Sequence, residues 1–179
     1  MRAVIVFDSM FGNTHEIAEA VAEGLVERAR VDLFTVDNAP EQLDSDVDLL
    51  VVGGPTHGHG LSNRTSRQVS QKQARQGAVP ARIGLREWLS QLTRPQRLVA
   101  AASFDTRFRK PAWLTGSAAR GAAKGLRQRG LVVVTPAESF FVDTATGPLC
   151  AGEADRARRW GAALGETVAL SGPARSRSA

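Results

Sequence analysis

Short apolar runs alternate along the chain with stretches in which apolar residues recur every three or four positions. Residues 3–7 form the first run, and the helical spacing after it predicts a helix from Asn13 to about Arg28. Apolar and polar residues alternate over residues 31–36, as in a half-covered or edge strand. Residues 47–52 form another apolar run, which we expect to stop at Gly53-Gly54-Pro55.

The same alternation continues to the end of the sequence, with one polar interruption. We expect a short helix at residues 41–45, and a long loop or loosely packed helix in the unusually polar segment 61–80. The other predicted elements are, in order, a helix marked by Ile83, Leu85, Trp88, Leu89 and Leu92, a strand at 98–103, a helix at 118–126 ended by Gly130, a strand at 131–135 and 139–142 interrupted at Pro136, and a closing helix marked by Ala157, Trp160, Leu164 and Val168.

Strands that alternate with helices predict an α/β fold, in which a parallel sheet is covered by helices on both faces. The pattern gives five strands, with the last one interrupted, and therefore predicts a doubly wound sheet. At 179 residues and 42% hydrophobic, the chain is long enough for one domain with a sizeable core, which we place at residues 1–170. Residues 171–179 consist only of Ser, Gly, Pro, Ala and Arg, and we expect a disordered tail there.

The stretch between the first strand and the first helix is a candidate anion site. A loop that leads into a helix N-terminus leaves backbone N–H groups free, and these together with the helix macrodipole attract an anion. Gly12 permits a close backbone approach, and Ser9, Asn13 and Thr14 add neutral polar groups. The loop contains no Lys, which excludes a Walker-type site, and no G-x-G-x-x-G, so a single terminal phosphate is the expected guest. The alternative is an ordinary helix cap, with Asn13 and Glu16 forming a capping box.

Charge is distributed unevenly along the chain. Residues 1–60 contain 3 Lys or Arg against 11 Asp or Glu, whereas residues 61–130 contain 15 against 2. The basic middle third is typical of a docking face for an acidic partner, with Arg64, Arg67, Lys72 and Arg75 as candidates, or of a nucleic-acid patch. A solvated Arg-rich surface without a partner is the alternative. We favour a redox partner protein with an acidic face over nucleic acid.

Cysteine usage and hydropathy indicate a cytoplasmic protein. Cys150 is the only cysteine, so no internal disulfide can form, and it fits a reducing compartment as a small buried side chain. No apolar stretch approaches the length of a membrane span. The start of the chain has the pattern of a buried strand rather than of a secretory signal.

The stretch at residues 9–14, placed directly after the first strand, resembles the phosphate loop of flavodoxins, which holds the 5′-phosphate of FMN. The resemblance extends in element order over roughly residues 1–170 and implies the strand order 2-1-3-4-5, with the ligand at the switch between the first and third strands. Three loops should therefore meet: residues 9–14, the loop after the third strand and the loop after the fourth. The implied FMN-binding residues are Ser9, Met10, Phe11, Gly12, Asn13, Thr14, Pro55, Thr56, His57, Gly58, Phe104, Asp105, Thr106 and Arg107.

The two later loops depart from the family pattern. Many flavodoxins have Trp after Pro-Thr and stack a Tyr from the fourth-strand loop on the flavin, but here His57 stands in the first place and the chain has no tyrosine. Phe104, Phe108 and Trp113 are the aromatic candidates near the fourth strand. We expect no metal at the His57 and His59 pair, because no cysteine or nearby carboxylate completes a ligand set.

These observations predict an FMN-binding electron-transfer protein in which the flavin supplies the chemistry. No nucleophile or acid–base pair stands out, and we assign no catalytic residue. One alternative is an FMN-dependent NAD(P)H or quinone reductase of the same fold, with segment 61–80 as a lid. Another is a flavin-free scaffold or binding module that uses its basic face.

Overall fold

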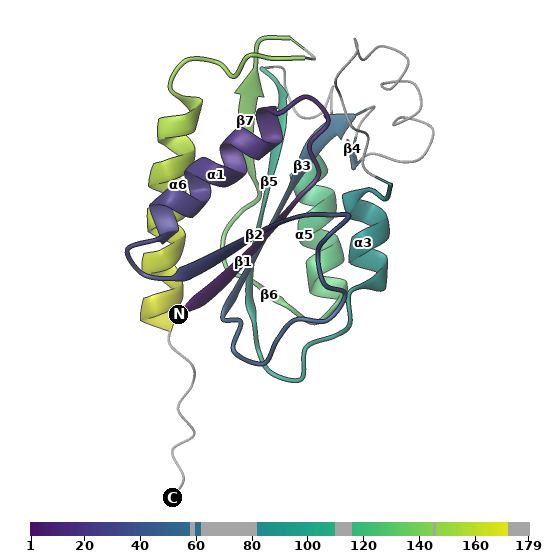
Figure 1. Ribbon diagram of the computed structural model, residues 1–179, viewed down its shortest axis with the longest axis vertical. Coiled ribbons are helices and arrows are strands. Elements are labelled where there is room, and N and C mark those ends of the chain that lie inside the picture. The colour runs from purple at the N-terminus through teal and green to yellow at the C-terminus, as the bar shows by residue number, and fades with distance from the viewer. Residues whose placement is uncertain (58–59, 62–81, 110–115, 145, 172–179) are drawn as a thin grey trace, which may run out of the picture.

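A computed structural model of the protein describes residues 1–57, 60–61, 82–109, 116–144 and 146–171. The strands are β1 (Arg2–Phe7), β2 (Arg30–Thr35), β3 (Leu49–His57), β4 (Gly60–Leu61), β5 (Ala100–Phe108), β6 (Val132–Val133) and β7 (Glu138–Val142). They form one sheet with the order β2-β1-β3-β5-β6, in which β7 also pairs with β5 and β4 pairs with β3 (Figure 1).

All pairings along the main path are parallel. β6 pairs with the first residues of β5 and β7 with its last five, so the two short strands together form one interrupted edge strand. Counted in this way, the sheet has the expected order 2-1-3-4-5, and the doubly wound α/β fold is confirmed. β4 is antiparallel to the end of β3 and lies off this path.

Helices cover both faces of the sheet. α1 (Asn13–Leu25) and α6 (Glu153–Ser171) pack on one face, and α3 (Leu85–Gln91) and α5 (Ala118–Gln128) on the other (Figure 1). Both faces of the buried strands can pack against helices, because successive apolar side chains of a strand point to opposite faces of the sheet. No helix in the described ranges combines the length and apolar character that a membrane crossing requires.

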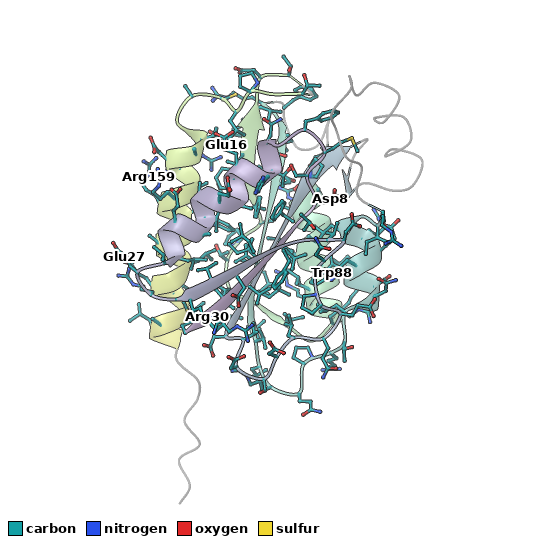
Figure 2. All side chains as sticks on the ribbon, in the orientation of Figure 1. Asp8, Glu16, Glu27, Arg30, Trp88 and Arg159 are labelled. Carbon is teal, nitrogen blue, oxygen red and sulfur yellow. The ribbon has the colours of Figure 1, made fainter. Side chains whose placement is uncertain are left out.

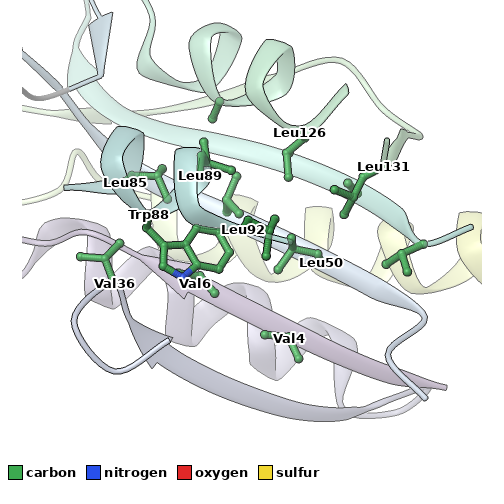
Figure 3. Packing of buried hydrophobic residues seen from close by; sticks show 14 of the residues in the cluster. Val4, Val6, Val36, Leu50, Leu85, Trp88, Leu89, Leu92, Leu126 and Leu131 are labelled. Carbon is green, nitrogen blue, oxygen red and sulfur yellow. The ribbon is translucent and has the colours of Figure 1, made fainter. Parts of the chain in front are cut away.

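Each face has its own core. Val4 and Val6 of β1 pack with Leu50 of β3 and with α3 and α5, around the fully buried Trp88 (Figure 3). The intervening Ile5 packs with α1 and α6 on the other face. That second core includes an aromatic cluster in which Phe104, Phe140 and Trp160 meet edge to face, with ring centroids 6.0–6.2 Å apart.

Two glycines bring the backbones of α1 and α6 into direct contact. A Cβ placed on Gly161 of α6 would lie 2.3 Å from the carbonyl oxygen of Val21, and one on Gly24 of α1 would lie 2.0 Å from that of Arg158. Neither helix can carry a side chain at these positions without moving apart from the other. The helix that begins at the candidate anion loop is therefore held tightly against α6.

The prediction of a short helix at residues 41–45 is wrong. The structure has turns and bends there, and the carbonyl groups that a helix would use accept bonds from elsewhere. The N–H of Thr93 donates to the oxygen of Glu41, and the Arg97 side chain donates to the oxygens of Ser45 and Val47. Five residues gain too few internal hydrogen bonds to compete with these tertiary contacts.

The predicted ends of the third and fourth strands were also wrong. β3 continues through Gly53-Gly54-Pro55, because these residues pair with Phe104, Asp105 and Thr106 of β5. Pairing with β1 ends at Gly53 and pairing with β4 begins at Thr56, so the missing N–H of Pro55 interrupts neither ladder. The segment expected to be a loop after residue 103 is the second half of β5, which is held by β7.

Segment 61–80 can be followed only at its start, where Leu61 lies in β4 rather than in a loop or helix. The rest of that segment and residues 172–179 of the expected tail lie outside the described residues. Ser171 belongs to α6.

We expect Gly161→Ala to lower the free energy of unfolding by about 1–3 kcal/mol or more, because the new methyl group overlaps backbone atoms of α1. Gly165→Ala in the same helix is the matched control. Its Cβ would meet the flexible Arg28 side chain at 3.2 Å, and helix propensity favours Ala by about 1 kcal/mol. Urea denaturation of the two variants measures the difference, and equal stabilities would show that the α1–α6 contact is not tight.

Candidate functional site

The loop between β1 and α1 forms an uncapped turn. Gly12 occupies the N-cap position of α1 with φ +89°, and no side chain caps the helix. Asn13 is already the first helical residue, so the capping box considered from the sequence is not formed. Within the described residues, the N–H groups of Asn13 and Thr14 donate to no acceptor, whereas the N–H of His15 donates to Ser9 Oγ at 3.2 Å.

The space in front of this turn is open. Gly12 is exposed, and a Cβ placed on it would meet no described atom within 4 Å. Because Ser9 Oγ accepts from His15, its own proton remains available to donate outward. The turn thus presents N–H and O–H donors and the positive end of a 13-residue helix to one accessible place.

A hollow lies beside the turn at the carboxyl edge of the sheet. Its walls come from the β1–α1 loop and from the ends of β3, β5 and β7. The hydroxyls of Thr14 and Thr106, 2.9 Å apart, join the first residues of α1 to β5 across its floor. The hollow is lined by Met10, Phe11, Asn13, Thr14, Pro55, Thr56, Thr106, Arg107, Phe108 and Val142.

A buried carboxylate lies behind the hollow. One oxygen of Asp105, Oδ2, accepts hydrogen bonds from the hydroxyls of Thr56 at 3.0 Å and Ser117 at 2.6 Å. It also accepts from the N–H of Ala119 at 2.9 Å, while the N–H of Ala118 donates to Thr56 Oγ1. Asp105 is fully buried, so these bonds replace the water that the charge has lost. They fix Thr56, a residue of the hollow, against the N-terminus of α5.

Arg107 brings positive charge to the hollow. Its Nε lies 3.9 Å from the other oxygen of Asp105, and its guanidinium lies 5.5 Å from the ring centroid of Phe141. The side chain is only 11% exposed. Asp105 therefore offsets part of the charge that Arg107 presents at this edge.

The structure brings most of the expected site residues together. Met10, Phe11, Asn13, Thr14, Pro55, Thr56, Thr106 and Arg107 line the hollow. Ser9 and Gly12 form the turn beside it, and Asp105 stands behind it.

Phe104 is not part of the site. It is fully buried in the core under α1 and α6, because even-numbered residues of this part of β5 point to that face. Gly53 accommodates its ring, since a Cβ there would lie 2.0 Å from Phe104 Cζ. The aromatic residues that line the hollow are Phe11 and Phe108, of which Phe108 is 40% exposed.

Some expected positions lie outside the described residues. These are Gly58, His59 and Trp113, and His57 is described only as the last residue of β3. In the part of the chain that the structure does describe, no three His, Cys, Asp or Glu side chains gather as a metal site would require.

Sequence analysis missed Val142 and Ser117. Val142 comes from β7, whose pairing to the far half of β5 could not be expected while that half was taken as a loop. A usable signal was present: in the sequence from Phe104 to Arg109, aromatic or hydroxyl residues alternate with charged ones, which is strand periodicity.

The segment after β7 contacts the turn at the Asn13 side chain. Gly147, with φ +97°, lies against the amide of Asn13, and a Cβ there would lie 2.5 Å from Asn13 Oδ1. Gly is therefore required at this position both by the backbone angle and by the contact.

A second hollow borders the first and shares Phe108 and Val142 with it. Its other lining residues are Arg109, Asp143, Cys150 and Ala151. The Cys150 thiol donates to Asp143 Oδ1 at 3.0 Å. This hydrogen bond to a carboxylate, together with burial, raises the pKa of Cys150.

A doubly wound parallel sheet with an open, uncapped turn and a hollow at the switch between β1 and β3 defines a class of α/β proteins that bind ligands at that edge. Comparisons of the chain with known proteins identify the same fold. Residues 5–82 match the family described as flavodoxin. This match and the solved structures below show a flavodoxin-like fold, as the sequence resemblance indicated.

Several solved structures share the fold. A flavodoxin from the domain Archaea gives a TM-score of 0.65 at 19% identity and covers 94% of this chain and 99% of its own. Flavodoxin 2 from Bacillus cereus gives a TM-score of 0.61 at 16% identity, and the match covers 96% of this chain and 100% of that one. A WrbA-like flavodoxin from Agrobacterium tumefaciens gives a TM-score of 0.54 at 20% identity, and the match covers 94% of this chain and 98% of that one. No curated protein matches the chain.

We expect Asp143→Asn to make Cys150 more reactive toward iodoacetamide at pH 7–8 (a window below the ordinary thiol pKa of about 8.5). The carboxylate holds the pKa of the thiol high, and removing its charge lowers that pKa, so more thiolate is present at a given pH. Because the chain has one cysteine, mass spectrometry of the alkylated protein gives the rate directly. Identical pH profiles for the variant and the wild type would show that Asp143 does not control this thiol.

Proposed function

We propose that the protein binds FMN non-covalently at the carboxyl edge of the sheet and serves as an electron carrier. The observation that carries the proposal is the turn at residues 9–14, where two N–H groups at the start of α1 have no described acceptor, Gly12 borders open space, and the hollow lies alongside. The flavodoxin-like fold supports it, because that fold places its ligand at this switch point.

The donor set fits a phosphate. The N–H groups of Asn13 and Thr14 and the hydroxyl of Ser9 would donate to its oxygens, and the macrodipole of α1 would stabilise its charge. Residues 9–14 themselves include no Asp or Glu, although Asp8 precedes them and Glu16 lies in the first turn of α1.

The hollow fits a flat ring with a polar edge. Met10, Phe11, Pro55, Phe108 and Val142 supply apolar contacts, and Thr56, Thr106 and Arg107 supply polar groups. In this arrangement Phe108 takes the place at which many flavodoxins have a tyrosine. The bound flavin would supply the ability to accept and release electrons, while these residues would hold it, exclude water from one side and adjust its reduction potentials.

If the turn holds the phosphate, FMN should bind far more tightly than riboflavin, which lacks it. We expect Ser9→Ala to weaken FMN binding by about 1–3 kcal/mol through loss of a charge-assisted hydrogen bond, and to leave riboflavin binding nearly unchanged. Ser90→Ala in α3 is the control, because its hydroxyl bonds only the nearby Glu87 carbonyl. Fluorescence titration measures the affinities. Similar affinities for FMN and riboflavin would exclude the phosphate site.

Arg107 should make the fully reduced, negatively charged flavin easier to form. A guanidinium near the flavin stabilises negative charge, and Asp105 offsets part of that effect. We expect Arg107→Gln to lower the potential for adding the second electron by on the order of 40 mV.

Arg109→Gln is the matched control, because Arg109 also lies 5.5 Å from the Phe141 ring but does not line the FMN hollow. Potentiometric titration of both variants in the FMN-loaded state makes the comparison. A second-electron potential unchanged by Arg107→Gln would mean that Asp105 neutralises the charge or that the flavin lies elsewhere.

The second candidate function is an FMN-dependent NAD(P)H or quinone reductase. The adjoining hollow that contains Arg109 and Cys150 favours it, because an electron donor or acceptor there would lie next to the flavin. Oxidation of NADH or NADPH by the FMN-loaded protein with a quinone acceptor distinguishes this enzyme from a carrier. A colourless preparation that takes up no FMN would support the flavin-free alternative.

A further inference from the structure

A groove runs between α3 and α5 on the face opposite α1 and α6. Leu89, Gly121 and Gly125 line its floor, and the two helices approach closely, since a Cβ on Gly125 would lie 3.2 Å from Leu89 Cδ1. The rims are polar: Arg86 and Ser90 stand on α3, and Lys124, Gln128 and Arg129 on α5 or just beyond it.

Lys124 lines the groove on the α5 side, and two further cations of α5, Arg120 and Arg127, lie next to it along the helix. Arg120, Lys124 and Arg127 are exposed and follow one another at spacings of four and three residues, which places them along one stripe of the helix. α5 contains no Asp or Glu. Arg94 and Arg129 add further positive charge beside the groove, where Arg94 packs against Gly130 and Arg129 donates to the carbonyl of Ser90.

Five cations on or beside the groove have no close carboxylate, as is also true of Arg109 and Arg159 elsewhere in the described chain. In the described part of the chain, Arg94, Arg120, Lys124, Arg127 and Arg129 have no carboxylate within 4.0 Å. On the remaining faces of the described chain, seven arginines are ion-paired with Asp or Glu. These are Arg2, Arg28, Arg30, Arg97, Arg107, Arg156 and Arg158. Arg94, Arg120, Lys124, Arg127 and Arg129 therefore contribute positive potential beside the groove that no described carboxylate within 4.0 Å of them offsets.

We propose that this groove is a docking surface for a carboxylate-rich segment of a partner protein. The proposal rests on the proposed function, since an electron carrier needs a partner that it meets transiently. A charged, polar surface without a large apolar patch fits such an encounter, and the exposed large apolar side chains of the described residues all lie off α3 and α5.

Charge and shape favour an acidic protein over nucleic acid. The described residues of this face present no exposed aromatic ring on which a base could stack. The N-terminal third of the chain is strongly acidic and would repel a long polyanion that extends past the groove. A short acidic segment can lie between the two rims without meeting that region.

The groove is connected to the FMN hollow through the start of α5. Ala118 donates its N–H to Thr56 of the hollow at 2.9 Å, and Gly121 of the groove floor follows three residues later. Three helical residues rise about 4.5 Å, so a segment bound in the groove would lie within one or two turns of the cofactor edge.

The test uses the full-length, FMN-loaded protein and a poly-L-glutamate peptide as the probe. We expect amide NMR shifts at Gly121 and Gly125 on addition of the peptide, with Gly161 between α1 and α6 unaffected. Lys124→Glu should weaken peptide binding about tenfold at low salt, because an attraction is replaced by a repulsion.

Arg159→Glu is the matched control. It makes the same change in net charge at an exposed arginine of α6, on the opposite side of the molecule (Figure 2). An equal loss in the two variants would overturn the proposal, because the peptide would then respond only to net charge. So would shifts spread over both faces, or tighter binding of a single-stranded or duplex oligonucleotide than of the peptide near physiological salt.

The outcome is separate from that of the proposed function. Lys124→Glu should keep the FMN affinity of the wild type, and the apoprotein should still bind the peptide if the groove acts alone. If no preparation binds FMN but the peptide still binds, the docking surface stands and the proposed flavin function is wrong. If FMN binds but the peptide does not, only the docking surface is wrong.

Discussion

Three donors converge on one oxygen of the buried Asp105 carboxylate: the hydroxyls of Thr56 and Ser117 and the N–H of Ala119. A carboxylate removed from water without such partners would destabilise the fold by several kcal/mol, whereas each charge-assisted bond contributes about 1.5–3 kcal/mol. The end of β3 and the start of α5 therefore have to meet at this residue of β5. The shape of the carboxyl edge depends on that requirement, since Thr56 lines the hollow at the switch between β1 and β3, and α5 forms one side of the groove between α3 and α5.

The two regions with functional potential are consequently parts of one assembly. The N-terminus of α5 is bonded to Thr56 and Asp105, and the N-terminus of α1 is joined to β5 through the Thr14 and Thr106 hydroxyls. Helices from both faces of the sheet thus meet the same strand at its carboxyl end. A ligand in the hollow would contact the anchors of both helices.

The sequence was sufficient for the fold because the information lies in long periodic segments. The placement of strands and helices followed from alternation along the chain, and the strand order followed from the resemblance of residues 9–14 and of the element order to flavodoxins. The strand ends were missed because they are set by partners far along the chain: β7 extends β5 past Ser103, and β5 carries β3 through Pro55. The same cause misplaced Phe104, whose direction depends on strand register. Val142 could be assigned to the site only once the β5–β7 pairing was known.

The close contact of α1 with α6 has an electrostatic consequence. Because backbone touches backbone at Gly24 and Gly161, α1 can neither rotate nor tilt freely about its axis. The direction of its dipole is thus fixed by interior packing before any anion arrives. An anion at the turn would then meet donors that already point toward it, and little free energy would be lost in reorienting them. The absence of side chains at Gly24 and Gly161 thus affects how strongly an anion would be bound at the N-terminus of α1.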